Sequence, residues 1–567
     1  MLVAGQLWYL QVLEGPRLSE LSERNRIRVR PVLAPRGTLY DRHHIPLVDT
    51  RPGFTLLVIP RELESRDVVL ARLSILLKVP VTELEAALTS APANSPKSVP
   101  LRRGLTFEDA GRVEEWRAEL PGMVVEVEPQ RGYPLGSSGA GVLGYVREAS
   151  AEQVREGRHP PGALVGQSGL ERLLDDFLRG RDGGEHVETD PRGRPLRVLR
   201  REEPQPGSNV ITTLDRRLQE AAEQALGAAA GAVVVVDPRN GEVLTMVSSP
   251  AFDLTRFAGP MERDEWLRLV RDPQHPLLNR GFQAEYPAGS IFKLVVAAAA
   301  LQEGVITPFD TLPCPASVTI GSRPFRNWQD EELGPMTLER AIALSCNTFF
   351  YHLGLRVGIE RIARYAEAFG FGRPTGVALP GERRGLIPYP NRPGGLLRRS
   401  WFPGDTANVA IGQGHVLVTP LQVATFMAAI ANGGILWRPR LVQRLEAPGR
   451  AIMPFPAEVA SRVTFSPAAL TVLRKALWGA VNEGGTGAAA RVHGLEVAGK
   501  TGTAQIGRAG GGPDHAWFAG YAQAGDPEVV VVVLVERGGT GGQVAAPIAR
   551  RIFEEIFRSS LTPEHPA

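Results

Sequence analysis

The stretch Tyr286-Pro-Ala-Gly-Ser290-Ile-Phe-Lys293 constrains this chain more than any other, because it leads without a break into the apolar run 294–301. Gly289 allows the backbone to turn, and the apolar run predicts a buried helix that Ser290 opens. Lys293 follows Ser290 by three residues, so the hydroxyl and the amine share one face of the first turn. Unpaired N–H groups at a helix start would stabilise the oxyanion of an acyl group attacked by Ser290.

Lysine is rare in this chain, which gives Lys293 particular weight. Only five of the 64 Lys and Arg residues are lysine, so arginine supplies almost every cation. A guanidinium keeps its proton near neutrality, whereas a lysine amine that is buried or lies beside another cation can become a neutral base. The alternative is that Ser290 merely caps the helix, since Ser-x-x-Lys is a short pattern.

Length and charge exclude several classes of protein. The 567 residues allow three or four domain-sized pieces, and the net charge of +3 is spread over many arginines without a long basic run. A nucleic-acid partner is therefore not indicated. Two cysteines exclude a disulfide-rich scaffold and leave the redox compartment open.

The N-terminal segment leaves two interpretations open. Residues 1–13 are apolar and aromatic, but a membrane-spanning helix needs about 20 such residues. Residues 1–14 could form an amphipathic or interfacial helix, or they could be the remnant of a longer membrane anchor that begins before Met1. No cleavable signal peptide is evident.

Composition and pattern divide the rest of the chain near residues 203–207, which are rich in proline. Residues 15–205 form the first domain, with a small α+β insertion at about 52–130. In the insertion we expect strands at 54–59 and 124–127 and helices at 67–77, 82–88 and 107–120. Residues 168–179 are expected to form one short helix, and 179–203 to be extended.

The second domain, residues 206–560, draws its strands from both ends of its sequence. The expected strands are 232–236, 242–248, 500–506, 515–522 and 528–536, with the last two joined across 525–527. Helices are expected at 215–229 and 547–557, and a helical middle, 290–480, separates the two groups of strands. This arrangement predicts an α/β domain whose sheet is mostly antiparallel.

Two further short motifs fall in the second domain. Ser345-Cys346-Asn347 follows the helical run 338–344, and Lys500-Thr501-Gly502-Thr503 opens a strand. Together with Ser290 and Lys293, in this order, they resemble the superfamily of penicillin-binding proteins and serine β-lactamases.

The resemblance covers nearly the whole chain and is strongest to class B penicillin-binding proteins. Within this class the chain is most similar to the elongation type, penicillin-binding protein 2. The resemblance implies a β-lactamase-like transpeptidase domain with helices on both faces of its sheet, and an elongated α+β pedestal. The stretches that carry it are 207–215, 276–280, 407–414, 418–422 and 515–521 for the catalytic domain, 36–42 and 166–171 for the pedestal, and Tyr286, 404–406 and 515–517 for the elongation type.

The resemblance also implies a role for each motif residue. Ser290 would attack the carbonyl between two D-alanines of a peptidoglycan stem peptide and form an acyl-enzyme, and Lys293 would accept the serine proton. Ser345 would relay a proton to the leaving group, and Asn347 would hold a substrate amide. Lys500, Thr501 and Thr503 would bind the terminal carboxylate around Gly502, and the N–H groups of Ser290 and Thr503 would form the oxyanion hole.

No cofactor or metal is expected. Some relatives are thought to hold zinc near the second motif through carboxylates, a histidine and a cysteine. Here Asn327 stands where one carboxylate would align, no histidine lies between His275 and His352, and Cys346 is expected to be a buried thiol. Ser345 and Asn347 could also be a simple helix end and turn.

A different class of function has to be weighed at residues 494–501, which match the P-loop pattern Gly-x4-Gly-Lys-Thr in full. A phosphate-binding loop must follow a strand and open a helix. Residues 495–498 are themselves strand-like, and the glycine-rich segment after Thr501 predicts no helix. The sequence therefore argues against nucleotide binding.

Other functions share the expected fold. A D,D-carboxypeptidase or β-lactamase would pass the acyl group to water, and a scaffold would chiefly activate a RodA-like SEDS glycosyltransferase. The expected partners are stem peptides, that glycosyltransferase, β-lactam inhibitors and the membrane. We expect the plasma membrane as location, with the catalytic domain on its extracytoplasmic side.

Overall fold

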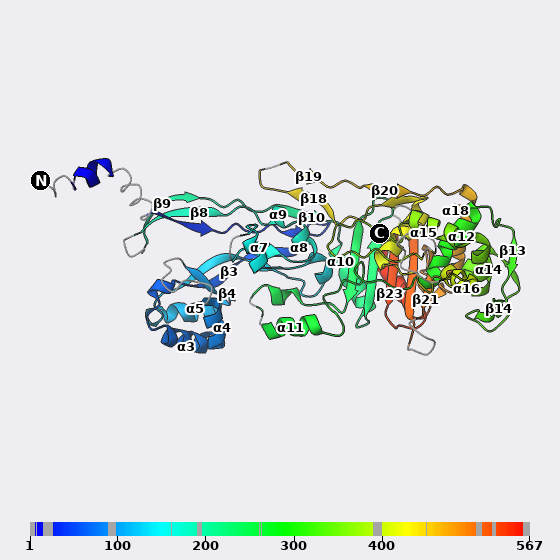
Figure 1. Cartoon of the computed structure of the whole chain (residues 1–567), viewed down its shortest axis with the longest axis horizontal. Helices are drawn as coiled ribbons and strands as arrows, with labels where there is room; N and C mark the ends of the chain where they lie inside the picture. The colour runs from blue at the N-terminus through cyan, green and yellow to red at the C-terminus, as the bar shows by residue number, and fades with distance from the viewer. Residues whose placement is uncertain are drawn as a thin grey trace, which may run out of the picture.

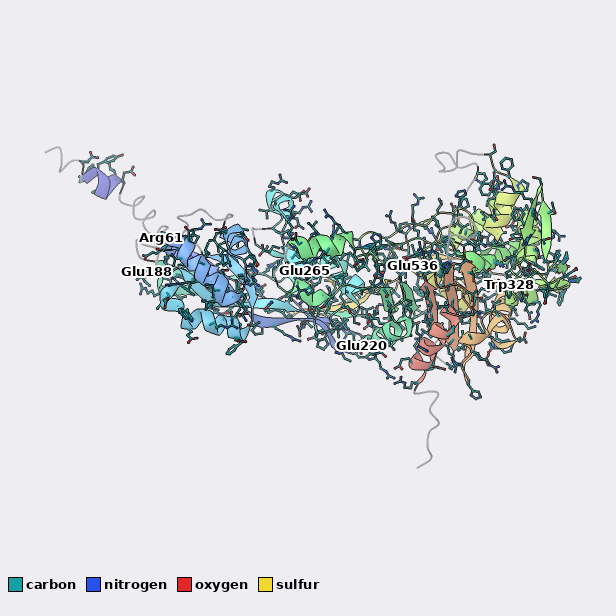
Figure 2. All side chains as sticks on the ribbon, turned by 90° about the horizontal axis from the view of Figure 1, so that it is seen from below. Arg61, Glu188, Glu220, Glu265, Trp328 and Glu536 are labelled. Carbon is teal, nitrogen blue, oxygen red and sulfur yellow. A yellow bond between two sulfur atoms is a disulfide. The ribbon has the colours of Figure 1, made fainter. Side chains whose placement is uncertain are left out.

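The computed structural model shows an elongated molecule, with the first domain and the second domain at opposite ends (Figure 1). The side view places Glu188 in the first domain and Trp328 toward the far end of the second (Figure 2). The structure describes residues 6, 8–14, 27–88, 98–159, 162–189, 195–259, 261, 263–388, 390, 400–449, 451–505, 513–523 and 529–558.

The described part of the N-terminal segment is a short π-helical turn, Tyr9–Leu13, whose side chains at Tyr9, Val12 and Leu13 are exposed. No helix in the described ranges is both long and apolar enough to cross a membrane. The polar segment that follows, 15–26, lies outside the described residues.

The first domain is the pedestal, and two sheets form its frame. A three-stranded sheet has the order β1-β8-β9. A seven-stranded sheet has the order β19-β18-β10-β2-β3-β4, with β5 also paired to β3, and takes three of its strands from the second domain: β10 (Asn209–Thr212), β18 (Val442–Glu446) and β19 (Met453–Pro454). The strands of the pedestal are β1 (Ile27–Val32), β2 (Leu39–Tyr40), β3 (Pro46–Val58), β4 (Val99–Leu105), β5 (Met123–Gly132), β6 (Val146–Glu148), β7 (Leu164–Gly166), β8 (Gly183–Thr189) and β9 (Pro195–Glu202).

The small α+β insertion is present, with helices α3 (Arg66–Leu77), α4 (Val81–Leu88) and α5 (Phe107–Glu115) packed on strands β3, β4 and β5. Two expected helices differ in detail. The helix from Phe107 ends at Glu115 and continues as a 3-10 turn, Arg117–Glu119, and the segment expected as one helix breaks at Leu174 into α8 (Gly169–Leu173) and α9 (Asp175–Leu178).

The two domains share one sheet. Strand β10 (Asn209–Thr212) pairs in parallel with β2 of the pedestal and antiparallel with β18 (Val442–Glu446), which in turn pairs with β19 (Met453–Pro454). Backbone hydrogen bonds therefore run from the pedestal into the second domain. The sheet crosses the boundary that the sequence predicts near residues 203–207.

The second domain is built on a five-stranded antiparallel sheet of order β12-β11-β23-β22-β21. This confirms the prediction that strands from both ends of the domain join. The strands are β11 (Gly231–Val236), β12 (Val243–Ser249), β21 (Glu496–Ala504), β22 (His515–Gln523) and β23 (Val529–Val535). The expected connection at 525–527 lies outside the described residues.

Helices cover both faces of this sheet, as the resemblance implies. Strand β23 is a run of valines because successive side chains enter two different cores. Val531 and Val533 pack with α10 (Arg216–Leu226) and α19 (Ala545–Ile556), whereas Val530 and Val532 belong to the core that holds the larger helical part. That part comprises α12 (Lys293–Gln302), α13 (Leu338–Ala343), α14 (Asn347–Val357), α15 (Ile359–Ala368), α16 (Pro403–Ala410), α17 (Pro420–Asn432) and α18 (Pro467–Asn482).

Candidate active site

Ser290 lies on a 3-10 turn, Gly289–Phe292, that leads directly into the buried helix α12. Gly289 adopts φ +55°, and a Cβ there would lie 2.9 Å from the carbonyl oxygen of Thr503 on strand β21. Only glycine fits both the conformation and this close approach. Gly289 therefore brings the candidate nucleophile against the strand that carries the third motif.

The side chain of Lys293 is fully buried, and its hydrogen bonds with described residues all go to the second motif. Its Nζ donates to the carbonyl oxygen of Ser345 at 2.7 Å, to Ser345 Oγ at 3.2 Å and to Asn347 Oδ1 at 2.7 Å. Burial and the nearby charge of Lys500 lower the pKa of Lys293 well below its usual value. In its neutral form the amine keeps two N–H groups for the two contacts at 2.7 Å and a lone pair that can take the proton of Ser290, as acyl transfer needs.

The second motif is a sharp turn between two helices. Helix α13 ends at Ala343, Ser345 adopts φ +57°, and α14 begins at Asn347. A left-handed conformation at a serine costs on the order of 1 kcal/mol and has to be held by its surroundings. The turn directs both Ser345 and Asn347 toward Lys293.

The third motif lies on β21, the last strand of the five-stranded sheet. Lys500 is fully buried, its Nζ donates to the carbonyl oxygen of Thr501 at 3.0 Å, and burial lowers its pKa to about 7. Thr501 Oγ1 donates to Thr486 Oγ1 at 2.6 Å, and Thr503 Oγ1 accepts from the N–H of Gly541 at 3.3 Å. Gly502 fits closely, since a Cβ there would lie 3.0 Å from Trp517 Cβ.

The structure thus brings the three motifs together. Lys293 connects the first motif to the second, and Gly289 sets Ser290 beside Thr503 of the third. The hydroxyl of Ser290 is half-buried and makes no hydrogen bond with any described residue. Strand β21 runs through Gly499, Lys500 and Thr501, so the P-loop alternative is wrong, because these residues open no helix.

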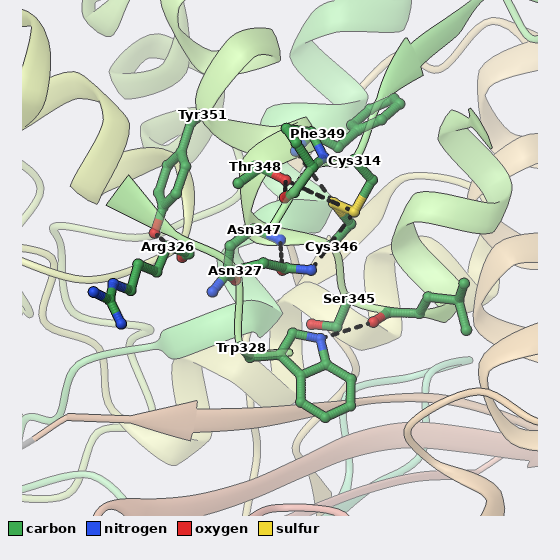
Figure 3. The surroundings of a disulfide bond; sticks show 12 residues. Cys314, Arg326, Asn327, Trp328, Ser345, Cys346, Asn347, Thr348, Phe349 and Tyr351 are labelled. Atoms are coloured by element: carbon green, nitrogen blue, oxygen red, sulfur yellow. Dashed lines mark hydrogen bonds between the residues drawn. A yellow bond between two sulfur atoms is a disulfide. The ribbon is translucent and has the colours of Figure 1, made fainter. Parts of the chain in front are cut away.

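One prediction about the second motif is also wrong. Cys346 is not a thiol, because its sulfur is bonded to Cys314, although it is fully buried as expected (Figure 3). The small strands β13 (Thr311–Pro313) and β16 (Pro335–Thr337) place Cys314 within reach of the turn. The only signal in the sequence was that the chain holds two cysteines, an even number.

Sequence reasoning also missed two polar contacts around this turn. Asn327 Oδ1 accepts the N–H of Asn347 at 2.9 Å, and the indole N–H of Trp328 donates to the carbonyl oxygen of Leu344 at 3.1 Å. Both residues follow the hairpin of β14 (Ser317–Ile320) and β15 (Arg323–Arg326).

The zinc site of some relatives does not fit the residues of this chain. The amide oxygen of Asn327 accepts a hydrogen bond from the backbone N–H of Asn347. The two cysteine sulfurs are bonded to each other, so neither cysteine is a thiolate. Within the described ranges, no three His, Cys, Asp or Glu side chains lie close enough to hold a metal ion.

Comparisons with known proteins match the chain over almost its full length. A family model described as the penicillin-binding protein dimerisation domain matches residues 31–212, and one described as the penicillin binding protein transpeptidase domain matches residues 231–554. The peptidoglycan D,D-transpeptidase MrdA of Acinetobacter baumannii is 31% identical to this chain, over 100% of the chain and 87% of its own length.

Solved structures agree. Penicillin-binding protein 2 of Helicobacter pylori, solved in complex with MreC, has a TM-score of 0.82 at 27% identity and covers 94% of this chain and 100% of that one. A chain of a peptidoglycan synthase complex that coordinates polymerization and crosslinking has a TM-score of 0.76 at 34% identity, over 100% of this chain and 97% of that one. This chain therefore belongs to the class B penicillin-binding proteins, of the penicillin-binding protein 2 type, with a dimerisation domain in front of its transpeptidase domain.

Proposed function

We propose that the chain is a peptidoglycan D,D-transpeptidase of cell-wall elongation, in which Ser290 carries the acyl group. The observation that carries this proposal is the environment of Lys293, a buried amine with a lowered pKa whose hydrogen bonds all go to neutral oxygens of the second motif. A lysine held in this way serves as a base rather than as an ion-pair partner.

In the first step Ser290 Oγ attacks the carbonyl carbon between two D-alanines and transfers its proton to Lys293 Nζ. The N–H groups of Ser290 and Thr503 receive the oxyanion that forms. The C–N bond then breaks, Ser345 relays the proton held by Lys293 Nζ to the departing amine, and D-alanine leaves. An amine of a second stem peptide then attacks the carbonyl carbon of the ester and gives up a proton to Lys293, which returns it to Ser290 Oγ as the ester C–O bond breaks, so that the cross-link forms and Ser290 is regenerated.

Lys500 and the hydroxyls of Thr501 and Thr503 bind the terminal carboxylate of the donor peptide. Because the pKa of Lys500 is about 7 in the free protein, this side chain carries only part of its charge near neutrality. An arriving carboxylate favours the protonated form, so substrate binding takes up a proton at Lys500. Asn347 holds an amide of the peptide by the side chain that also accepts from Lys293.

The decisive test is intact-mass analysis after incubation with benzylpenicillin, followed by peptide mapping. We expect one penicilloyl adduct, on Ser290, in the wild-type chain and none in Ser290→Ala. An adduct on another residue, or none on folded protein in the presence of its membrane partner, would refute the proposed nucleophile. Circular dichroism of both proteins establishes that they are equally folded.

A scaffolding role is a second candidate, favoured by the structural match to a chain of a peptidoglycan synthase complex. We propose that the pedestal contacts a RodA-like SEDS glycosyltransferase at the extracytoplasmic face of the plasma membrane, with the segment 1–14 at the membrane. Ser290→Ala separates the two roles. Glycan polymerisation by the partner should survive this change, whereas cross-linking, and carboxypeptidase activity if there is any, should be lost.

A further inference from the structure

The disulfide between Cys314 and Cys346 sits at the centre of the second motif. Cys346 lies between Ser345 and Asn347, and both of these neighbours accept hydrogen bonds from Lys293. The bond joins positions 32 residues apart, and both cysteines are fully buried. Any displacement of Cys346 therefore moves both acceptors of the candidate base.

The turn has an intrinsic reason to move. Ser345 is one of the few residues other than glycine with a left-handed backbone, at φ +57°, and such a conformation persists only where neighbouring contacts enforce it. Helix α13 contributes some of them, since the N–H of Ser345 donates to Ile342 and that of Cys346 donates to Ala341. These contacts fix the turn from one side only.

The other side is held by the segment that carries Cys314. Two antiparallel strands, β13 and β16, form its base, and the pairing continues past them, because the N–H of Cys314 donates to the carbonyl oxygen of Gly334 at 3.0 Å. Polar contacts join this segment to the start of α14: Thr348 Oγ1 donates to the carbonyl oxygen of Pro315 at 2.8 Å, and Asn327 accepts the N–H of Asn347 (Figure 3).

The sulfur atoms take part in the same network. Cys346 Sγ accepts the N–H of Phe349 at 3.3 Å and so caps α14, and Asn327 Nδ2 lies 3.7 Å from Cys314 Sγ as a donor. Asn327 thus contacts both the disulfide and the backbone of Asn347. Within this cluster the disulfide is the single covalent connection, and hydrogen bonds between neutral groups contribute only about 1 kcal/mol each.

We propose that the Cys314–Cys346 disulfide positions Ser345 and Asn347 for acylation of Ser290, so that the oxidised chain is the competent enzyme. This inference rests on the proposed acyl-transfer function. A displacement of about 1 Å at a catalytic constellation can lower the rate by on the order of 10²-fold. The oxidised state also fits a catalytic domain outside the cytoplasm.

The test compares Cys314→Ala with the wild-type chain in acylation by benzylpenicillin. This variant breaks the covalent bond and leaves Cys346 in place to accept from Phe349. We expect the acylation rate constant at saturating benzylpenicillin to fall at least tenfold, with circular dichroism unchanged. Val533→Ala, on the opposite face of the sheet among α10 and α19, is the matched control, because it lowers the melting temperature without contacting the second motif.

A second measurement uses the wild-type chain, in which these are the only two cysteines. Dithiothreitol supplies the two electrons and two protons that convert the disulfide to two thiols, and it is oxidised to its own cyclic disulfide. We expect the reduced chain to be acylated at least tenfold more slowly and reoxidation to restore the rate. Thiol titration in denaturant should find no free thiol before reduction and two afterwards.

Two results would show that the disulfide is absent or not needed: two free thiols in the untreated chain, or acylation at the wild-type rate by Cys314→Ala or by the reduced chain. Two others would show that it acts only through stability. One is an equal fall in the acylation rate constant of Val533→Ala when its melting temperature matches that of Cys314→Ala, and the other is loss of the near-ultraviolet circular dichroism of the reduced chain together with its acylation. The last would show a bond that only maintains the fold. Absence of acylation in the oxidised, folded wild-type chain in the presence of its membrane partner would instead refute the proposed function itself.

Discussion

The pedestal and the acyl site both bury charged side chains, but they treat the charge in opposite ways. In the pedestal Arg36 and Arg131 both pair with the fully buried Glu171, at 2.7 and 2.6 Å, and Arg36 also pairs with Asp175 at 2.8 Å. In the acyl site, the hydrogen bonds of Lys293 and Lys500 go to carbonyl, hydroxyl and amide oxygens, all of them neutral.

The difference appears in the proton affinities. Burial disfavours the charge of Arg36, but the carboxylates of Glu171 and Asp175 outweigh it, so the pKa of Arg36 is raised. Burial acts on Lys293 without a compensating carboxylate, and Lys500 adds repulsion, so the pKa of Lys293 is lowered. Paired buried charges hold the pedestal together, whereas unpaired ones supply a reactive amine.

The largest effect that tests this comparison is expected at the base itself. Lys293→Ala should lower the acylation rate constant with benzylpenicillin by about 10³-fold, because it removes the buried amine that would accept the Ser290 proton. Stopped-flow fluorescence with a fluorescent penicillin would measure the rate. The matched control is Lys475→Ala, since Lys475 is an exposed lysine paired with Glu339 at 3.2 Å. Equal loss in both variants would show that lysine matters here only as a surface charge.

The next effect concerns stability in the pedestal. Glu171→Ala removes the carboxylate that pairs with both Arg36 and Arg131 and leaves the two guanidinium groups buried. We expect it to lower the free energy of unfolding by about 3 kcal/mol, as measured by urea denaturation. Glu265→Ala, which removes an exposed ion pair with Arg256, should cost less than about 1 kcal/mol. Similar losses in the two variants would contradict a structural role for the buried cluster.

These two regions also differ in how far the sequence reveals them. The apolar run after Ser290 and the continuous apolar runs of the strands in the second domain are strong local signals, and strands β11, β22 and β23 lie within two residues of their predicted bounds. The three motifs were found because each has a fixed spacing of residue types. None of the ion pairs around Glu171 was predicted, because residues 36, 131 and 171 are distant in sequence and their types are common.

Tertiary contacts explain the remaining errors. Strand β3 begins at Pro46, well before the predicted start at 54, because its pairing with β5 extends through Pro52 and Gly53, which have low strand propensity. The parallel pairing of β10 with β2 joins strands of four and two residues, too short to give a pattern. The left-handed turn at Ser345 and the disulfide beside it depend on the pairing of β13 with β16, whose position no local signal fixes.

The smallest expected effect is a change in the free energy of unfolding that should have opposite signs in the acyl site and in the pedestal. Lys500→Met removes a buried amine that forms no ion pair with a carboxylate in the described part of the chain, so we expect it to raise the free energy of unfolding by about 1 kcal/mol at pH 7, whereas Arg131→Met should lower it. The folded chain releases the Lys500 proton near pH 7 and the unfolded chain near 10.5, so between these values the unfolded state binds more protons and stability rises with pH. The advantage of Lys500→Met should therefore be greatest at pH 7 and below and shrink steadily toward pH 10. Urea denaturation of both variants at several pH values would measure this. A destabilised Lys500→Met at pH 7 would mean that the acyl site, like the pedestal, depends on its buried charge for stability.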